Sequence, residues 1–244
     1  MNGSSGSSKR SREPDAESGK RNVVLCVRDE KMDVSDAGSK ISASLDQNGC
    51  NPPTIPWAVP CITCDMVEGS EFKTFSHKDL LGCYYLVIFY PSDFSPLACS
   101  ELLAFSDRMR EFTALGCKVF ACSTDSKYSH LAWLNTSREK GGLGRLEFPL
   151  LADKSTKFSA SHSVLNDKNK MTPLMLLIID AKQNVRQMIL SDETSCHNVD
   201  EILRLVSAIQ YADNTGKICP GNWKPGDDGL PNHYPVKQVT SSSK

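Results

Sequence analysis

A buried strand that leads through a short turn into an amphipathic helix constrains the fold of this chain more than any other feature. Tyr84–Tyr90 is a continuous apolar and aromatic run, which is typical of a strand covered on both faces. Pro91 ends this run, and over Glu101–Leu115 apolar side chains recur at helical spacing: Leu102, Phe105, Met109 and Phe112. The turn between the two segments delivers Cys99 into the first turn of the helix. We therefore expect a strand–turn–helix unit at the centre of an α/β domain.

Strand and helix patterns alternate through the rest of the globular segment. The predicted elements are a strand at Lys118–Cys122, a helix at Tyr128–Arg138, hairpin strands at Leu174–Ile179 and Val185–Leu190, and a long final helix capped by Asn198. Glu201 follows Asn198 at the spacing of a capping box. This order predicts an α/β sandwich in which helices flank a central mixed sheet.

Composition divides the chain into three parts. Residues 1–52 are rich in Ser, Gly, Lys, Asp and Glu and show little apolar periodicity, so we expect a disordered N-terminal tail. Residues 53–212 carry the strand and helix patterns of the globular domain. Residues 213–244 are expected to form a C-terminal arm, because Pro, Gly and Asp accumulate from Ile218 onward.

Charge and apolar content argue against two classes of partner. The net charge of −1 gives no electrostatic reason to bind nucleic acid or an anionic membrane. The longest apolar stretches are strand-sized and fall well short of the ~20 residues that span a bilayer. Since the N-terminus lacks the apolar core of an export signal, we expect a cytoplasmic protein. The basic pairs Lys9-Arg10 and Lys20-Arg21 are either a two-part nuclear import signal or part of a solvated tail.

Ten cysteines raise the question of disulfides or a metal site. For a chain of 244 residues without an export signal, we expect free thiols in a reducing compartment. Cys61 and Cys64 form a lone CxxC motif, whose two readings are ordinary strand residues or a metal or redox pair. Residues three apart on a strand point to opposite faces, which favours the first reading. We expect neither a cofactor nor a metal.

The turn before the first helix carries the most specific motif. Phe89–Glu101 reads FYPSDFSPLACSE, and unpaired N–H groups with the positive end of the helix dipole favour a thiolate there. This stretch resembles the active-site loop of the typical two-cysteine peroxiredoxins, in which Pro, three residues, Thr, two residues and Cys follow one another. Counting from Pro91 puts Ser95 at the Thr position and Ala98 at the peroxidatic cysteine, so that Cys99 lies one residue late.

The resemblance extends from about Pro60 to Pro231. Further segments match the family: AFSDR (104–108), HLAWLNT (130–136), GGLG (141–144), IID (178–180), LRLVSAIQY (203–211) and ICPGNWKPG (218–226). The last of these places the family's resolving cysteine on Cys219. The family's active-site arginine, six residues before the aspartate of IID, falls on Leu174, and a second arginine falls on His197. Three positions of one site have therefore changed together.

The resemblance implies both a fold and a chemistry. The fold is a thioredoxin-like sandwich, and the reaction is attack of a thiolate on a hydroperoxide, followed by a disulfide to a second subunit that thioredoxin reopens. Pro91 would shield the site and the Ser95 hydroxyl would orient the peroxide. Homodimers and five-dimer rings are usual in this family, so the expected partners are a second copy, active relatives in mixed rings, thioredoxin and a hydroperoxide.

Two hypotheses follow. In the first, peroxidase activity is impaired or lost and the protein acts by assembly, because successive helical residues point ~100° apart and Cys99 cannot replace a sulfur at position 98. In the second, the chain is a thioredoxin-dependent peroxidase that uses Cys99 and Cys219. Cys219 is then either the disulfide partner of Cys99 in a second subunit or a free thiol whose arm packs on a neighbouring subunit.

Overall fold

The computed structural model describes residues 55–166, 169–192 and 194–232. The predicted tail at residues 1–52, with its basic pairs, lies outside the described residues, as does the last part of the predicted arm from residue 233 onward. Among the described residues, no helix is long and apolar enough to cross a membrane.

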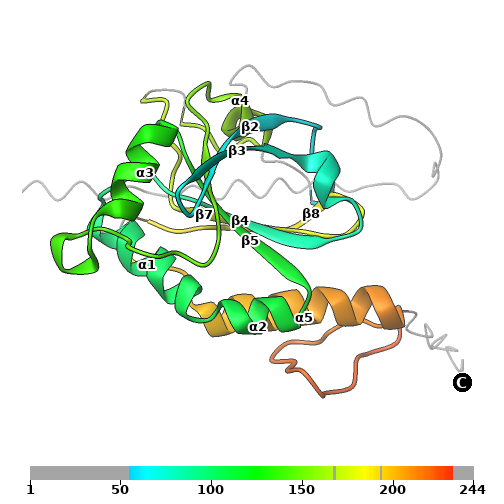
Figure 1. Ribbon diagram of the computed structural model, residues 1–244. Coiled ribbons are helices and arrows are strands. Elements are labelled where there is room, and N and C mark those ends of the chain that lie inside the picture. Colours follow the sequence, from blue (N-terminus) through cyan, green and yellow to red (C-terminus); the bar gives the residue numbers. More distant parts are fainter. Residues whose placement is uncertain (1–54, 167–168, 193, 233–244) are drawn as a thin grey trace, which may run out of the picture. The chain divides into compact units, whose positions relative to one another are not determined.

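A mixed sheet forms the centre of the described domain (Figure 1). Its strand order is β1-β8-β7-β4-β5-β6-β2-β3. β4 pairs with β5, and β5 with β6, in parallel, whereas the other neighbours are antiparallel. The strands are β1 (Trp57–Ala58), β2 (Thr63–Glu68), β3 (Glu71–Ser76), β4 (Tyr84–Phe89), β5 (Cys117–Ser123), β6 (Leu150–Ala152), β7 (Met175–Ile179) and β8 (Asn184–Leu190).

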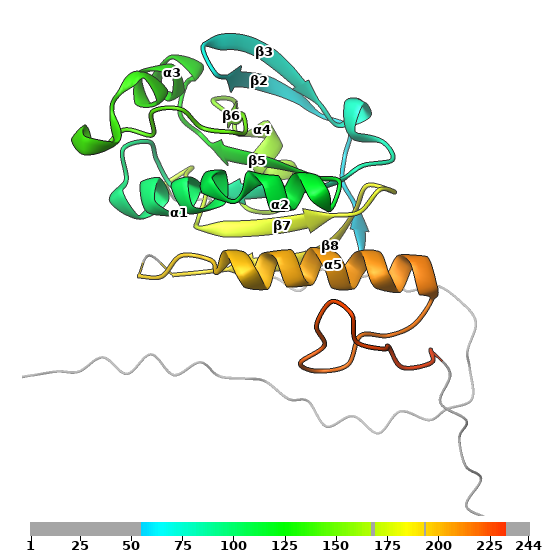
Figure 2. The same cartoon turned by 60° about the horizontal axis from the view of Figure 1, so that its bottom comes forward.

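Helices cover the sheet and enclose two apolar cores (Figure 2). The helices are α1 (Pro96–Asp107), α2 (Met109–Ala114), α3 (Lys127–Asn135), α4 (Lys157–Ser161) and α5 (Val199–Thr215), with the short 3-10 helices η1 (His77–Leu80) and η2 (Arg138–Lys140). Successive side chains of β4 pack into the two cores in turn, because side chains alternate between the two faces of a strand. Leu86 and Ile88 pack with α1, α2 and α5, whereas Tyr85 and Val87 pack with Phe158 of α4. The predicted sandwich of a mixed sheet and flanking helices is confirmed.

The strand predictions agree with the structure to within one residue at each end, but the first helix was placed wrongly. It begins at Pro96 rather than Glu101, because Pro suits the first position of a helix and Ser95 caps it. The predicted Glu101–Leu115 helix is also interrupted at Arg108, between α1 and α2. The second predicted helix ends at Asn135 instead of Arg138, where η2 follows.

The CxxC motif lies at the start of β2. Cys61 is exposed and Cys64 is half-buried within the strand, and both are free thiols. Burial, assisted by the nearby carboxylates of Asp153 and Asp65, raises the pKa of Cys64 to about 12. A redox-active thiol requires a lowered pKa, so Cys64 has the properties of an ordinary strand residue.

Candidate functional site

The loop between β4 and α1 forms a capped helix start. Ser95 has an extended backbone, and its Oγ accepts a hydrogen bond from the N–H of Ala98 at 3.4 Å. The N–H of Cys99 already donates to the Ser95 carbonyl, at 2.9 Å. Cys99 is therefore the first residue of α1 whose N–H is held by the helix itself, and Ala98 lies in the half-open first turn.

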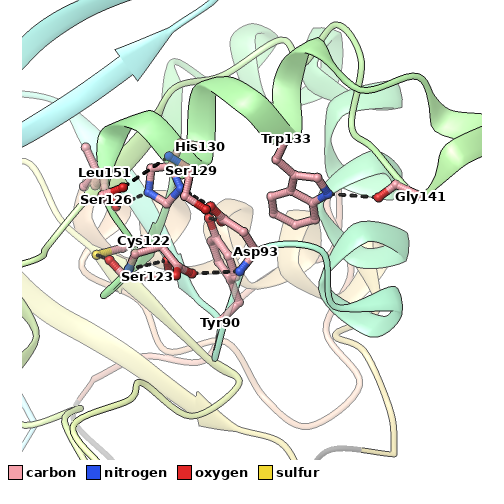
Figure 3. Close-up of polar contacts among 11 residues, drawn as sticks. Tyr90, Asp93, Cys122, Ser123, Ser126, Ser129, His130, Trp133, Gly141 and Leu151 are labelled. Carbon is pink, nitrogen blue, oxygen red and sulfur yellow. Dashed lines mark hydrogen bonds and ion pairs between the residues drawn. The ribbon is translucent and has the colours of Figure 1, made fainter.

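A buried polar network holds this loop in place (Figure 3). Tyr90 donates its hydroxyl hydrogen to Asp93 Oδ1 at 3.0 Å, and His130 Nδ1 lies 2.9 Å from Asp93 Oδ2. The N–H of Asp93 donates to Asp125 Oδ2 at 2.8 Å. The side chains of Asp93 and His130 are both almost completely buried. Because buried polar groups are costly to leave unpaired, these bonds fix the loop against α3 and β5.

A cavity of about 450 Å³ opens over the first turn of α1. It brings together four positions that the sequence analysis singled out: Pro91, Ser95, Ala98 and Leu174. The remaining lining residues are Ser92, Pro96, Leu97 and Met171. None of these lining side chains carries a charge. The cavity can therefore accept a small apolar or hydroxyl-bearing group, but the described residues that line it offer a reactant no cation.

Cys99 does not line this cavity. Its side chain is half-buried, and its thiol lies 3.6 Å from the carbonyl oxygen of Gly142, in the loop that follows η2. Burial raises the pKa of the Cys99 thiol, and the guanidinium of Arg138 only partly opposes this effect. The protonated thiol is thus favoured, in contrast to the thiolate that a nucleophile needs.

His197 forms a buried pair with Glu101 of α1. The Nδ1 of His197 is 2.5 Å from Glu101 Oε1, and its Nε2 is 3.2 Å from the Ile189 carbonyl oxygen. Both side chains are almost fully buried, and His197 is not among the residues that line the cavity. The imidazole therefore ties α1 to the segment between β8 and α5 and does not face the cavity.

Comparison with known proteins identifies the family of this chain. A family model described as AhpC/TSA family matches residues 59–188, and a second, described as the C-terminal domain of 1-Cys peroxiredoxin, matches residues 208–240. The chain belongs to the peroxiredoxin family. Peroxiredoxin 2 of Drosophila melanogaster is 43% identical over 174 residues, which are 71% of this chain and 90% of the relative. A thioredoxin peroxidase of Trypanosoma brucei rhodesiense is 45% identical over 161 residues, 66% of this chain and 81% of the relative.

Solved structures confirm the peroxiredoxin fold. The reduced 2-Cys peroxiredoxin of Plasmodium vivax superposes with a TM-score of 0.70 at 32% identity, covering 73% of this chain and 93% of that protein. AhpC of Enterococcus faecalis superposes with a TM-score of 0.64 at 28% identity, covering 68% and 98%. The thioredoxin-like sandwich expected from the sequence is thus the observed fold.

The second cysteine predicted for this peroxiredoxin, Cys219, lies on the described part of the arm. Its thiol is 3.5 Å from the Ala208 carbonyl oxygen, so the arm folds back onto α5 of its own chain. Burial raises the pKa of Cys219, and Arg204 partly opposes this. Cys99 contacts the 141–144 loop and Cys219 contacts α5, and both are free thiols. Their predicted disulfide between two subunits stays a prediction.

Sequence reasoning missed several residues of the site. Asp93 and His130 anchor the loop, although their pairing spans 37 positions and leaves no local pattern. Met171 reaches the cavity wall from the segment before β7, and no motif marks it. Cys196 lies beside the first turn of α1, with its thiol 3.5 Å from the Leu97 carbonyl oxygen. Burial, and to a smaller extent the negative charge of Glu101, raises the pKa of Cys196. The Cys196 thiol is therefore a poor nucleophile too.

Proposed function

We propose that this peroxiredoxin has impaired or lost peroxidase activity and acts through assembly, with itself or with active relatives, in redox homeostasis. One observation carries the proposal. The uncharged cavity over the first turn of α1 is lined by Ala98, while the neighbouring thiol of Cys99 faces the Gly142 carbonyl oxygen elsewhere. The counting of the loop motif, which assigns Ala98 to the peroxidatic position, agrees with this arrangement.

Energetics support the loss of activity. A misplacement of about 1 Å between reacting groups can cost ~100-fold in rate. A cation ~4 Å from a thiolate contributes roughly 4 kcal/mol at an effective dielectric near 20, and Leu174 supplies none. Without such a cation, an ordinary thiol is only a few per cent ionised at neutral pH. Cys99, with its raised pKa, is ionised still less.

The described residues leave one edge of the sheet open for pairing with a second copy. β1 accompanies β8 only at Asn184 and Val185, so within the described residues the outer edge of β8 from Arg186 to Leu190 has no strand beside it. Leu190 on this edge is largely exposed. An open edge with an exposed apolar side chain can pair with the same strand of a second copy. This supports a homodimer, built by edge pairing as in the family resemblance.

The alternative is a thioredoxin-dependent peroxidase that reduces hydrogen peroxide and organic hydroperoxides through Cys99 and Cys219. Two features favour it. Two relatives, from Trypanosoma brucei rhodesiense and Echinococcus granulosus, carry the name thioredoxin peroxidase, and Arg138 lies close enough to Cys99 to lower its pKa in part. This reading requires α1 to open so that the thiol leaves Gly142. The cytoplasmic and nuclear localisation expected from the sequence stays a prediction under either function.

Stopped-flow mixing of the reduced protein with hydrogen peroxide tests the proposal. We expect no fast oxidation and no turnover with thioredoxin and its reductase. The double variant Ala98→Cys, Leu174→Arg should gain activity, because it restores a sulfur and a cation to the same cavity. Rapid turnover by the unaltered protein, abolished by Cys99→Ser, would establish the alternative. A disulfide-linked dimer formed after mild peroxide and lost in the same Cys99→Ser variant would support it.

A further inference from the structure

Two adjoining cavities lie beside α2, away from the cavity over the first turn of α1. One is mainly apolar and measures about 490 Å³, and the other is rich in arginine and measures about 510 Å³. They share two lining residues, Met109 and Glu147, so they are neighbours on the surface beside α2. Neither is explained by the proposed function.

The apolar cavity exists because β6 is short. β6 pairs only with the last three residues of β5, Ala121–Ser123. Within the described part of the chain, Cys117–Phe120 therefore has no strand on that side, and α2 packs alongside β5 there (Figure 2). Met66, Val119 and Phe148 line the resulting slot. Methionine side chains such as Met66 adapt to the shape of an apolar ligand.

The second cavity presents three guanidinium groups: Arg110, Arg138 and Arg145. Arg138 lies 3.4 Å from Asp107, and Arg145 lies 3.0 Å from Glu147, so both already have a carboxylate partner. Arg110 is exposed and forms no ion pair with any described residue. Guanidinium groups bind phosphate and carboxylate through paired N–H donors. The arginine-rich cavity therefore has the chemistry of an anion site: Arg110 is available, and the exposed Arg145–Glu147 pair is weak enough for a ligand anion to displace Glu147.

Charged residues at the rim of the apolar slot also favour an anionic ligand. Glu68 lines the slot and pairs with Lys73 at 2.6 Å, although Lys73 also lies 3.2 Å from Glu71. Lys118 lines the slot too, and it makes no ion pair within the described residues. The combined space thus joins an apolar wall to a surplus of positive charge.

We propose that these cavities bind one anionic amphiphile: a single acyl or alkyl chain in the slot beside Met66 and Phe148, with its phosphate or carboxylate head on Arg110 and Arg145. The slot volume lies within the ~300–1,000 Å³ range of small-molecule sites. A nucleotide would bring an anion without an apolar chain. A neutral lipid would bring a chain without an anion, so neither matches both halves of the site.

Calorimetric titration of the full-length protein with dodecyl phosphate, kept below its micellar concentration, tests this site. We expect one equivalent to bind. The double variant Arg110→Ala, Arg145→Ala should bind at least tenfold more weakly, and both side chains are exposed, so the fold should tolerate the change. The matched control Lys182→Ala removes an exposed charge from the turn between β7 and β8, and its affinity should equal that of the unaltered protein.

Head and chain are tested separately. Inorganic phosphate and dodecyl maltoside should each bind at least tenfold more weakly than dodecyl phosphate. Thr113→Glu places a carboxylate on an exposed residue of α2 that lines the slot, and it should reduce affinity at an unchanged melting temperature. Absence of binding would overturn the proposal. So would equal affinity of the double arginine variant, or ATP or dodecyl maltoside binding as tightly as dodecyl phosphate.

Discussion

Gly142 lies where the loop that receives the Cys99 thiol crosses the end of α3. A Cβ atom built at this position would come within 2.0 Å of the Thr136 carbonyl oxygen, which belongs to the backbone and cannot move aside cheaply. The same residue provides the carbonyl oxygen that Cys99 contacts. The requirement for glycine and the position of the thiol therefore have one origin, the close approach of two backbone segments.

Substitution of Gly142 tests this packing. Gly142→Ala should lower the free energy of unfolding by about 3 kcal/mol, because overpacking a tight contact displaces backbone. Urea denaturation measures the effect. Gly221→Ala is the matched control, since a Cβ there meets no atom within 4 Å, and its stability should be unchanged. Equal stability of both variants would contradict the close approach.

The ionisation of Cys99 gives a second prediction at this scale. Because burial raises its pKa, alkylation of Cys99 by iodoacetamide should be slow at neutral pH and should still be rising in alkaline solution. Arg138→Ala should slow it further, because the guanidinium favours the thiolate, whereas Lys140→Ala serves as the control. Mass spectrometry of the Cys99 peptide gives the rate. A rate that levels off below neutral pH would mean that the thiol is activated after all.

At the scale of elements, one carboxylate joins three segments of the fold. Asp93 receives hydrogen bonds from Tyr90 at the end of β4 and from His130 of α3, while its own N–H donates to Asp125. The loop that forms one wall of the cavity is thus held by side chains as well as by the cap of α1. Opening of α1, which the alternative function requires, does not by itself break this network.

Removal of this carboxylate should loosen the loop. Asp93→Ala leaves the buried His130 and Tyr90 without their partner, and an unsatisfied buried polar group costs about 1–3 kcal/mol. Thermal or urea unfolding measures the loss, and hydrogen exchange around Pro91–Ser95 should increase. Asp93→Asn keeps part of the hydrogen bonding and should lose less. If both variants were as stable as the unaltered protein, the network would not anchor the loop.

At the scale of the whole molecule, two buried imidazoles make stability depend on pH. His77 and His162 stack with ring centroids 5.3 Å apart in the core beside Phe158. Burial lowers the pKa of His77, and burial together with His77 lowers the pKa of His162 from 6.5 to about 4. Between pH 6.5 and about 4, the imidazoles of the unfolded chain therefore bind protons that the same imidazoles in the folded chain do not bind.

The sign of the effect follows from this difference. Stability is fully present above pH 6.5 and falls as the pH drops toward 4, with His162 contributing on the order of 3 kcal/mol. His162→Phe should flatten this part of the profile, as measured by urea denaturation across the range. A slope unchanged in the variant would show that other groups cause the acid sensitivity.

Much of this architecture was predictable from sequence, and the exceptions have physical causes. The buried run of β4, the hairpin of β7 and β8 and the cap at Asn198 are local patterns, and the structure has all three. The start of α1 was missed because Pro96 and Ser95 mark it chemically, while the apolar spacing begins later. The convergence of Pro91, Ser95, Ala98 and Leu174 was expected only from the family resemblance. The Glu101–His197 and Asp93–His130 pairs are set by tertiary packing, which no local pattern encodes.

Trp223 of the arm is almost completely covered, its ring centroid 5.1 Å from that of Tyr211 on α5, and its indole N–H donates to the Asp227 carbonyl oxygen. Trp133 of α3, by contrast, is fully enclosed in the core. Detachment of the segment carrying Cys219 would expose the Trp223 indole to water and leave the Trp133 indole buried. The chain thus contains an intrinsic fluorescent reporter of whether its second thiol is sequestered or released, readable without any label.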